Sequence, residues 1–231
     1  MTTSVRIAKI ERFSEIGVER LQNVQIVDES GLGLSEGEGK LIFQKSGSAI
    51  EDRSRLLTPY FADYDMQMNS KGFVFSREFN YYFVNKKFST FQTNDNLFLL
   101  NTNKKTANAF LKSLSREKNG NIKAYDFKPI PIDFNKITSK VDNLTGLWAE
   151  ANRANLHTQA FFGDNVNYDE EVKAILTERK ASFIQFDLVL DGVVRNMGIT
   201  KEGNVVFYNY SAKNPEIVMK LALEIYDTLI K

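Results

Sequence analysis

The sequence has no cysteine and a single histidine, His157, among its 231 residues. Without cysteine, disulfide bonds, cysteine metal sites and a thiol nucleophile are excluded. A single histidine excludes a metal site with two histidine ligands from one chain, and a serine triad would have to use His157 as its base. Because reactive groups are so few, we expect no cofactor and favour a protein that is not an enzyme.

An excess of charge of one sign is absent as well. The chain has 30 lysine and arginine residues and 29 aspartate and glutamate residues, which gives a formal net charge of +1. A protein whose main task is nucleic-acid binding more often has a clear basic excess, although a local basic patch is compatible with a balanced total. No apolar run approaches the roughly 20 residues of a membrane helix, and residues 1–12 lack a run of signal-peptide length. We therefore expect a soluble, cytoplasmic protein without membrane contact.

Apolar residues are plentiful: 42% of the chain is hydrophobic and 26% is charged, which is typical of a globular protein with a core. The expected fold class is α+β, with antiparallel sheets and helices packed on one face. Alternating apolar and β-branched residues, with turn signals at Asn85–Lys86, Asn94–Asp95, Asp191–Gly192 and Glu202–Gly203, predict the strands. The expected strands are residues 5–10, 18–26, 41–43, 73–75, 81–84, 88–91, 97–100, 122–127, 156–166, 182–190, 193–199 and 205–208.

Helical spacing of apolar residues predicts helices over residues 52–64, 104–115, 134–152 and 168–177. Pro59 is awkward inside the first of these and would kink it or mark its true start. Asn214–Pro215 predicts the start of a last helix, because asparagine is a favoured cap and proline a favoured first residue.

Two blocks about a hundred residues apart have the same predicted order of three strands followed by a helix, over residues 80–115 and from residue 185 onward. The extended segment 129–132, with two prolines, is the best candidate for a junction between them. We therefore expect a lobe over residues 1–128 and a second over residues 133–231, with a true duplication as one explanation. The alternative is that three strands and a helix are simply a common way to bury one sheet face.

The glycine-rich segment 31–39 does not fit a phosphate-binding loop. Gly39–Lys40 is followed by Leu41 rather than by a hydroxyl residue, and Leu34 occupies the position of the required earlier glycine. An acidic turn is the preferred interpretation.

An acidic cluster carries the hypothesis of a metal-dependent nuclease. Such enzymes hold a metal ion with carboxylates and use a lysine of an acidic-x-lysine triplet to stabilise charge. Asp169, Glu178 and Lys180 are the candidate residues here. The same triplet recurs at Glu171–Val–Lys173, so the pattern is unspecific, and a solvated helix face with local ion pairs is the simpler interpretation.

Aromatic residues beside lysines carry the hypothesis of a binding surface. Residues 71–75 share part of the basic-glycine-aromatic pattern of strands on which bases stack. The candidate residues for nucleic-acid or partner binding are Lys71, Phe73, Phe75, Tyr82, Lys86 and Lys87. An ordinary buried strand with a solvated edge is the competing interpretation.

The preferred function is a non-enzymatic binding or accessory protein that acts through a protein partner, a second copy of itself or nucleic acid. The alternatives are the metal-dependent nuclease and a binder of single-stranded nucleic acid that uses aromatic residues of a sheet face.

Overall fold

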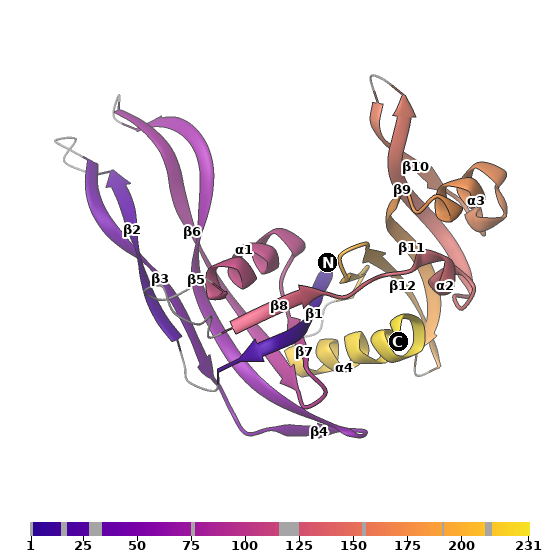
Figure 1. Cartoon of the computed structure of the whole chain (residues 1–231), viewed down its shortest axis with the longest axis horizontal. Coiled ribbons are helices and arrows are strands. Elements are labelled where there is room, and N and C mark those ends of the chain that lie inside the picture. Colours follow the sequence, from indigo (N-terminus) through magenta and orange to yellow (C-terminus); the bar gives the residue numbers. More distant parts are fainter. Residues whose placement is uncertain are drawn as a thin grey trace. The chain divides into compact units, whose positions relative to one another are not determined.

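The structure is a computed structural model, and it describes residues 2–14, 18–27, 34–74, 77–115, 125–153, 156–190, 192–210 and 214–231, for some of which only the backbone is described. It is mostly antiparallel sheet, with four α-helices in the ranges just given (Figure 1). Contacts between residues divide the chain into two compact units. Unit 1 contains Met1–Lys9, Asn101–Lys104 and Lys128–Lys231, and unit 2 contains Ile10–Leu100 and Lys105–Phe127. The predicted lobes, 1–128 and 133–231, stay a prediction.

Unit 2 is built on long antiparallel strands. They lie in the order β7-β6-β5-β3-β2, and the short strand β4 pairs with β5. Their bounds are β2 Val18–Val27, β3 Leu34–Lys45, β4 Ile50–Asp52, β5 Arg55–Val74, β6 Arg77–Thr93 and β7 Leu97–Leu100. The hairpin of β5 and β6 is the longest pairing, and its register runs from Leu57 opposite Thr93 to Val74 opposite Arg77.

The core of unit 2 lies between the sheet and helix α1, Lys104–Leu114. Phe110 of α1 is fully buried, with its ring 5.8 Å from that of Phe43, 5.7 Å from Tyr64 and 5.1 Å from Phe88. The Tyr64 hydroxyl and Ser113 Oγ lie 3.0 Å apart and share a hydrogen bond. Aromatic rings at these separations contribute beyond their buried area, so α1 is held firmly on this sheet face.

The strands of unit 1 form an antiparallel row, in the order β10-β9-β11-β12-β13-β1. Strand β1, Thr3–Phe13, enters it with its first residues, whose register places Thr3 opposite Phe207. The other strands are β9 Asn143–Arg153, β10 Leu156–Phe162, β11 Ala181–Leu190, β12 Val193–Thr200 and β13 Asn204–Phe207. Strand β8, Tyr125–Pro129, pairs with β1, and its first three residues belong to unit 2. The helices are α2 Phe134–Thr138, α3 Glu170–Thr177 and α4 Pro215–Ile225, with a 3₁₀ turn η1 Val166–Tyr168 and a π turn η2 Tyr226–Ile230.

Several predicted elements are confirmed. Helix α1 and strands β11, β12 and β13 lie where the sequence places them. Asn214 caps α4 as predicted, since its side chain accepts a hydrogen bond of 2.9 Å from the Glu216 amide and Pro215 opens the helix. These elements have clear local signals at both ends, which is why periodicity and capping sufficed.

The predicted helix over residues 52–64 is wrong, because these residues lie in strands β4 and β5 and the turn between them. Tyr60, Ala62 and Tyr64 alternate as buried residues of the core, while Phe61 points to the other sheet face. Pro59 has no amide hydrogen, but its carbonyl accepts a hydrogen bond from Ser46. The proline that was awkward for a helix is thus accommodated by a strand.

The predicted helix over residues 134–152 is also wrong beyond its first turn. Helix α2 ends at Thr138, and β9 begins at Asn143. The pairing of β9 with β11 contains two irregularities, between Ala181 and Phe183 and between Gln185 and Phe186. Such bulges interrupt the period of two, so the apolar residues of β9 fall at spacings that resemble those of a helix.

Two further turn predictions need correction. Asn85 and Lys86 lie inside the continuous strand β6 rather than in a turn, so the two strands predicted around them are one. The part of the glycine-rich segment that the structure describes, from Leu34 on, belongs to strand β3. In the described ranges, no helix is both long and apolar enough to span a membrane.

Candidate functional site

The ends of β5 and β6 form a two-stranded ribbon that carries the predicted binding residues. Tyr82 lies opposite Met68, and Phe73 lies opposite Glu78. Residues 78 and 82 are four apart on one strand, so Phe73 and Tyr82 share one face of the ribbon, about 13 Å apart along it. Lys86 lies opposite Tyr64 and therefore belongs to the same face.

These ribbon side chains are open to solvent. Phe73 is 73% exposed and Tyr82 is 42% exposed, although both are aromatic. Lys71 is exposed too and lies in the irregular stretch between Asn69 and Gly72, two residues before Phe73. Glu78 is exposed opposite Phe73. Phe75 lies outside the described residues.

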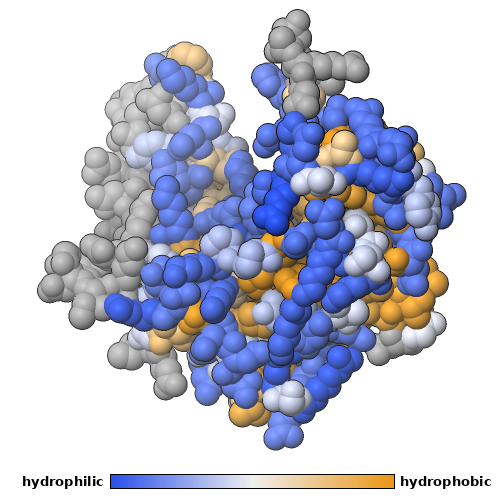
Figure 2. Space-filling view, turned by 45° about the vertical axis from the view of Figure 1, so that its right-hand side comes forward, coloured by the Kyte–Doolittle hydropathy of each residue, from blue (hydrophilic) through white to orange (hydrophobic). Residues whose placement is uncertain are grey.

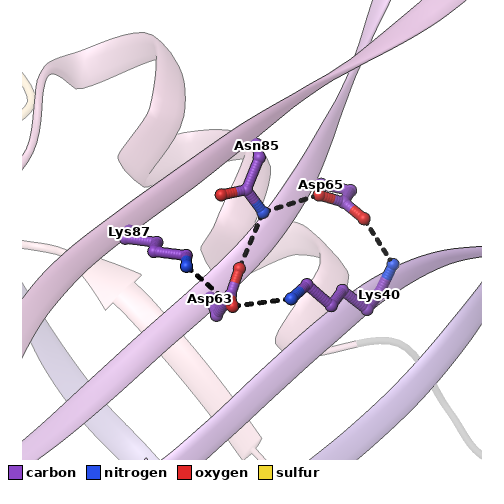
Figure 3. A network of polar contacts seen from close by, with 5 residues as sticks. All are labelled: Lys40, Asp63, Asp65, Asn85 and Lys87. Carbon is purple, nitrogen blue, oxygen red and sulfur yellow. Dashed lines mark hydrogen bonds and ion pairs between the residues drawn. The ribbon is translucent and has the colours of Figure 1, made fainter.

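Lys87 does not join this group, because it projects from the other face of the sheet toward Asp63 (Figure 3). Asp63 Oδ2 lies 2.8 Å from Lys40 Nζ and 3.8 Å from Lys87 Nζ. Asn85 Nδ2 donates to Asp63 Oδ1 and to Asp65 Oδ1, each at 2.7 Å. These contacts tie β3, β5 and β6 together on the face opposite the α1 core.

The charge of Asp63 is stabilised although its side chain is only 8% exposed. Burial alone would raise its pKa, but hydrogen bonds from Lys40 and Asn85 and the charges of Lys40 and Lys87 outweigh burial and lower the pKa. The bond to Asp63 also raises the pKa of Lys40. With its hydrogen-bonding capacity used in this way, Asp63 holds the strands in register and is poorly suited to accept a proton.

The candidate nuclease residues are not brought together. Asp169 caps the start of α3, where its Oδ1 accepts from the amides of Glu171 at 2.9 Å and Val172 at 3.2 Å. Glu178 is the cap at the other end of α3, nine residues on, which corresponds to about 14 Å along a helix. Lys180 Nζ pairs with Glu178 Oε2 at 2.5 Å. Asp169 and Glu178 are therefore too far apart to share one metal ion.

The acidic-x-lysine triplet has a local structural role instead. The Arg179 amide donates to the Leu176 carbonyl and the Lys180 amide to the Ile175 carbonyl, both at 3.1 Å. With Arg179 in the left-handed region, at φ 56°, these two bonds form the Schellman motif that ends a helix.

Unit 1 has an aromatic cluster that sequence reasoning missed. The ring of Trp148 on β9 lies 4.8 Å from that of Phe162 and 4.9 Å from that of Phe183, edge to face in both pairs. Gly198 lies beneath Phe183, because a Cβ on Gly198 would lie 2.1 Å from Phe183 Cζ. Phe162 is 66% exposed, so the cluster reaches the surface. The sequence analysis placed Trp148 in a helix, so it could not predict that Trp148 contacts Phe162 and Phe183 across neighbouring strands.

A row of polar side chains continues from this cluster along the same sheet face. Asp187 accepts from Asn196 Nδ2 at 2.8 Å and from Asn143 Nδ2 at 3.2 Å, and Gln185 Nε2 donates to Asn196 Oδ1 at 2.8 Å. Their register confirms the shared face, since Asp187 lies opposite both Asn196 and Asn143. Because these groups satisfy one another, the row is rigid rather than reactive.

Hydrophilic and hydrophobic side chains both reach the described surface. Figure 2 shows a face on which hydrophilic residues predominate and hydrophobic residues come to the surface in separate patches. The large hydrophobic residues recorded as exposed are Leu56, Phe73, Tyr82, Phe162, Tyr168, Val189, Val193, Val194 and Ile217. In the part of the chain that the structure describes, no three His, Cys, Asp or Glu side chains are placed to hold a metal ion together. His157 is exposed on β10.

Comparison with known proteins gives no family assignment: no family model matches the chain, and no curated protein was found to be similar to it.

Proposed function

We propose that the chain is a non-enzymatic binding protein that contacts single-stranded nucleic acid through the exposed face of the β5–β6 ribbon. The observation that carries the proposal is the exposure of Phe73 and Tyr82 on one ribbon face, together with the exposed Lys71 two residues before Phe73 and the partly exposed Lys86 four residues after Tyr82. Aromatic rings stack on bases of any sequence, and lysines contact the phosphates. Lysine is depleted at the centre of protein–protein interfaces, so this combination favours nucleic acid over a protein partner.

The experiment measures binding of a fluorescently labelled single strand of about 15 nucleotides by anisotropy, as a function of salt. Phe73→Ala should weaken binding about tenfold, since stacking on one base contributes about 1–3 kcal/mol. Tyr168→Ala is the matched control, because Tyr168 is an aromatic residue of unit 1 that is 71% exposed. It should leave the affinity unchanged.

Lys71→Ala should reduce the salt dependence of binding by about 0.7, the slope expected for one lost phosphate contact with a single strand. Lys105→Ala removes the charge of an exposed lysine on α1 and serves as its control. If wild-type protein binds no single strand even at low salt, or if Tyr168→Ala weakens binding as much as Phe73→Ala, the proposal is wrong.

A protein partner is the second candidate, favoured by the free end of the β11–β12 hairpin. Val189 and Val194 lie opposite each other there, and they are 49% and 67% exposed. Exposed apolar patches mark contact surfaces when they are contiguous. If a second copy covers this patch, sedimentation should show concentration-dependent association that Val189→Lys with Val194→Lys abolishes. A monomer at all concentrations contradicts self-association.

We further propose that the two units are similar lobes, each with a helix on one sheet face. Strands β5, β6 and β7 followed by α1 correspond in order to β11, β12 and β13 followed by α4. The third strand of each set has four residues, and each helix has eleven. The nuclease alternative gains no support from the geometry, because α3 separates Asp169 from Glu178.

A further inference from the structure

Unit 1 contains a cavity of about 550 Å³ that the proposed function does not use. Its apolar lining comes from Pro131, Ile132, Phe134, Leu176, Ala181 and Ile230. Helices α2 and α3 contact each other beside it (Figure 1), and Asn135 Nδ2 donates to the Leu176 carbonyl at 3.0 Å. Small-molecule sites usually have volumes of about 300–1,000 Å³, mostly apolar walls and a few polar groups that orient the ligand. The volume and lining of this cavity fit that description.

The charged lining is predominantly basic. It comprises Lys136, Arg179 and Lys201 against one carboxylate, Asp133. Asp133 caps α2, where its Oδ1 accepts from the Asn135 amide at 3.0 Å. Lys136 Nζ donates to the main-chain oxygen of Lys231 at 2.8 Å and is also engaged.

Two cations remain for a ligand. Within the described part of the chain, neither Arg179 nor Lys201 contacts a carboxylate, and Lys201 Nζ has only a long bond of 3.4 Å to the Arg179 carbonyl. Their neighbour Lys180, in contrast, is paired with Glu178. Among the described residues, the cavity therefore combines an apolar wall with two cations that have no carboxylate partner.

The backbone at Arg179 strengthens this observation. Residues other than glycine with positive φ in the described ranges are Arg53, Asn96, Asn165, Arg179 and Asn209. Three of these are asparagine, which tolerates the left-handed region, whereas arginine does so at a cost. Glycine is the usual residue at this position of a Schellman motif. An arginine there loses stability relative to glycine, and Arg179 lines a cavity whose one carboxylate, Asp133, forms no ion pair with it among the described residues.

We propose that this cavity binds a small organic molecule that carries a phosphate group and an apolar part. The planar guanidinium of Arg179 can bind two phosphate oxygens at once, and Lys201 supplies a second positive charge. Phe134, Leu176 and Ile230 contact the apolar part. The net charge of the charged lining, three cations against one carboxylate, matches a phosphate monoester of about two negative charges.

The test uses isothermal titration calorimetry on the full chain with phenyl phosphate, AMP and inorganic pyrophosphate, and with adenosine as the probe that lacks phosphate. At least one phosphate ester should bind more tightly than pyrophosphate, because only an ester fills the apolar wall. Adenosine should bind at least about tenfold more weakly than AMP, since it forms no charge-assisted hydrogen bonds. No binding of any phosphate at millimolar concentration, or equal binding of adenosine and AMP, overturns the proposal.

Arg179→Gly separates binding from folding. The thermal midpoint of the free protein should rise or stay constant, because glycine is unstrained at this φ, while affinity for the phosphate ester should fall about tenfold or more. Arg53→Gly is the matched control: it removes the same charge at the same kind of backbone position in unit 2, and affinity should be unchanged. Lys201→Gln should weaken binding as well. Equal losses in Arg179→Gly and Arg53→Gly would show that only net charge matters and would refute the site.

Discussion

The contact network around Asp63 allows a sharp test of how unit 2 is held together. Asp63→Asn keeps the size of the side chain but removes its charge. The amide offers one acceptor oxygen where the carboxylate now accepts from both Lys40 and Asn85. One of these donors must then face the new NH₂ group, so at least one charge-assisted hydrogen bond is lost in a place where the side chain is only 8% exposed.

The expected loss follows from the exposure of the partners. The side chains of Lys40 and Lys87 are 39% and 60% exposed, so water replaces Asp63 as their partner and we assign their pairing no net energy. The bond from Asn85 reaches an oxygen of Asp63, whose side chain is the shielded partner, and a hydrogen bond to a charged group contributes about 1.5–3 kcal/mol. We expect Asp63→Asn to lower the free energy of unfolding by about 1.5 kcal/mol, at the lower end of that range because water also reaches Asn85.

Urea unfolding near pH 7, followed by circular dichroism, measures this loss. Because the pKa of Asp63 is lowered in the folded state, its stabilisation is complete above the unfolded value of about 3.9 and is lost as the pH falls through the folded pKa. The difference between wild type and Asp63→Asn should therefore shrink below about pH 4. Glu51→Gln, an exposed residue of β4, is the control for charge alone. Equal stability of wild type and Asp63→Asn near pH 7 would refute the reasoning.

Three further predictions concern packing and capping. Gly198→Ala should lower the free energy of unfolding by about 1–3 kcal/mol, because the new Cβ displaces the ring of Phe183. The fluorescence emission of Trp148, which contacts that ring, should change as well. An unchanged emission spectrum would show that the Phe183 ring does not lie on Gly198. Asn214→Ala should cost about 1 kcal/mol in chemical unfolding through loss of the α4 cap, and Asn214→Asp should restore it; no difference between the two variants argues against the cap. Phe110→Ala should cost about 3–5 kcal/mol in the same assay, since this fully buried ring contacts three others, and a loss below about 1 kcal/mol would mean that α1 is not packed as described.

Local sequence signals were sufficient to predict an element where one or two residues fix the backbone conformation. Asn214 and Pro215 predicted the start of α4 because a cap and a fixed φ act within one turn. The turn at Asn94 and Asp95, which follows β6, was predicted for a similar reason. Such elements need no knowledge of what packs against them.

The strands β5 and β9 were not predictable in this way. In β5, Tyr60 and Phe61 are adjacent apolar residues that face opposite sides of the sheet, and together with Tyr64 they match helical spacing. In β9 the bulges shift the buried positions, so Leu144 and Leu147 are both buried although three residues apart. Whether such a segment forms a helix or a strand depends on pairing with strands that lie far away in the sequence. The periodicity of the segment itself does not show that pairing.

For the candidate sites, too, the sequence shows which residues are neighbours along the chain but not the backbone angles or the packing. The sequence named Phe73 and Tyr82 because aromatic residues lie near lysines there, and the structure adds that both side chains are exposed. Their role in binding stays a prediction. In the triplet Glu178–Arg179–Lys180, the nuclease hypothesis used the two outer residues, which form an ion pair with each other at the end of α3. The cavity proposal uses the middle residue, Arg179, because an arginine in the left-handed region is less stable there than a glycine would be. A sequence does not show backbone strain. Arg179 therefore became a candidate binding residue only once its φ angle and the cavity that it lines were known.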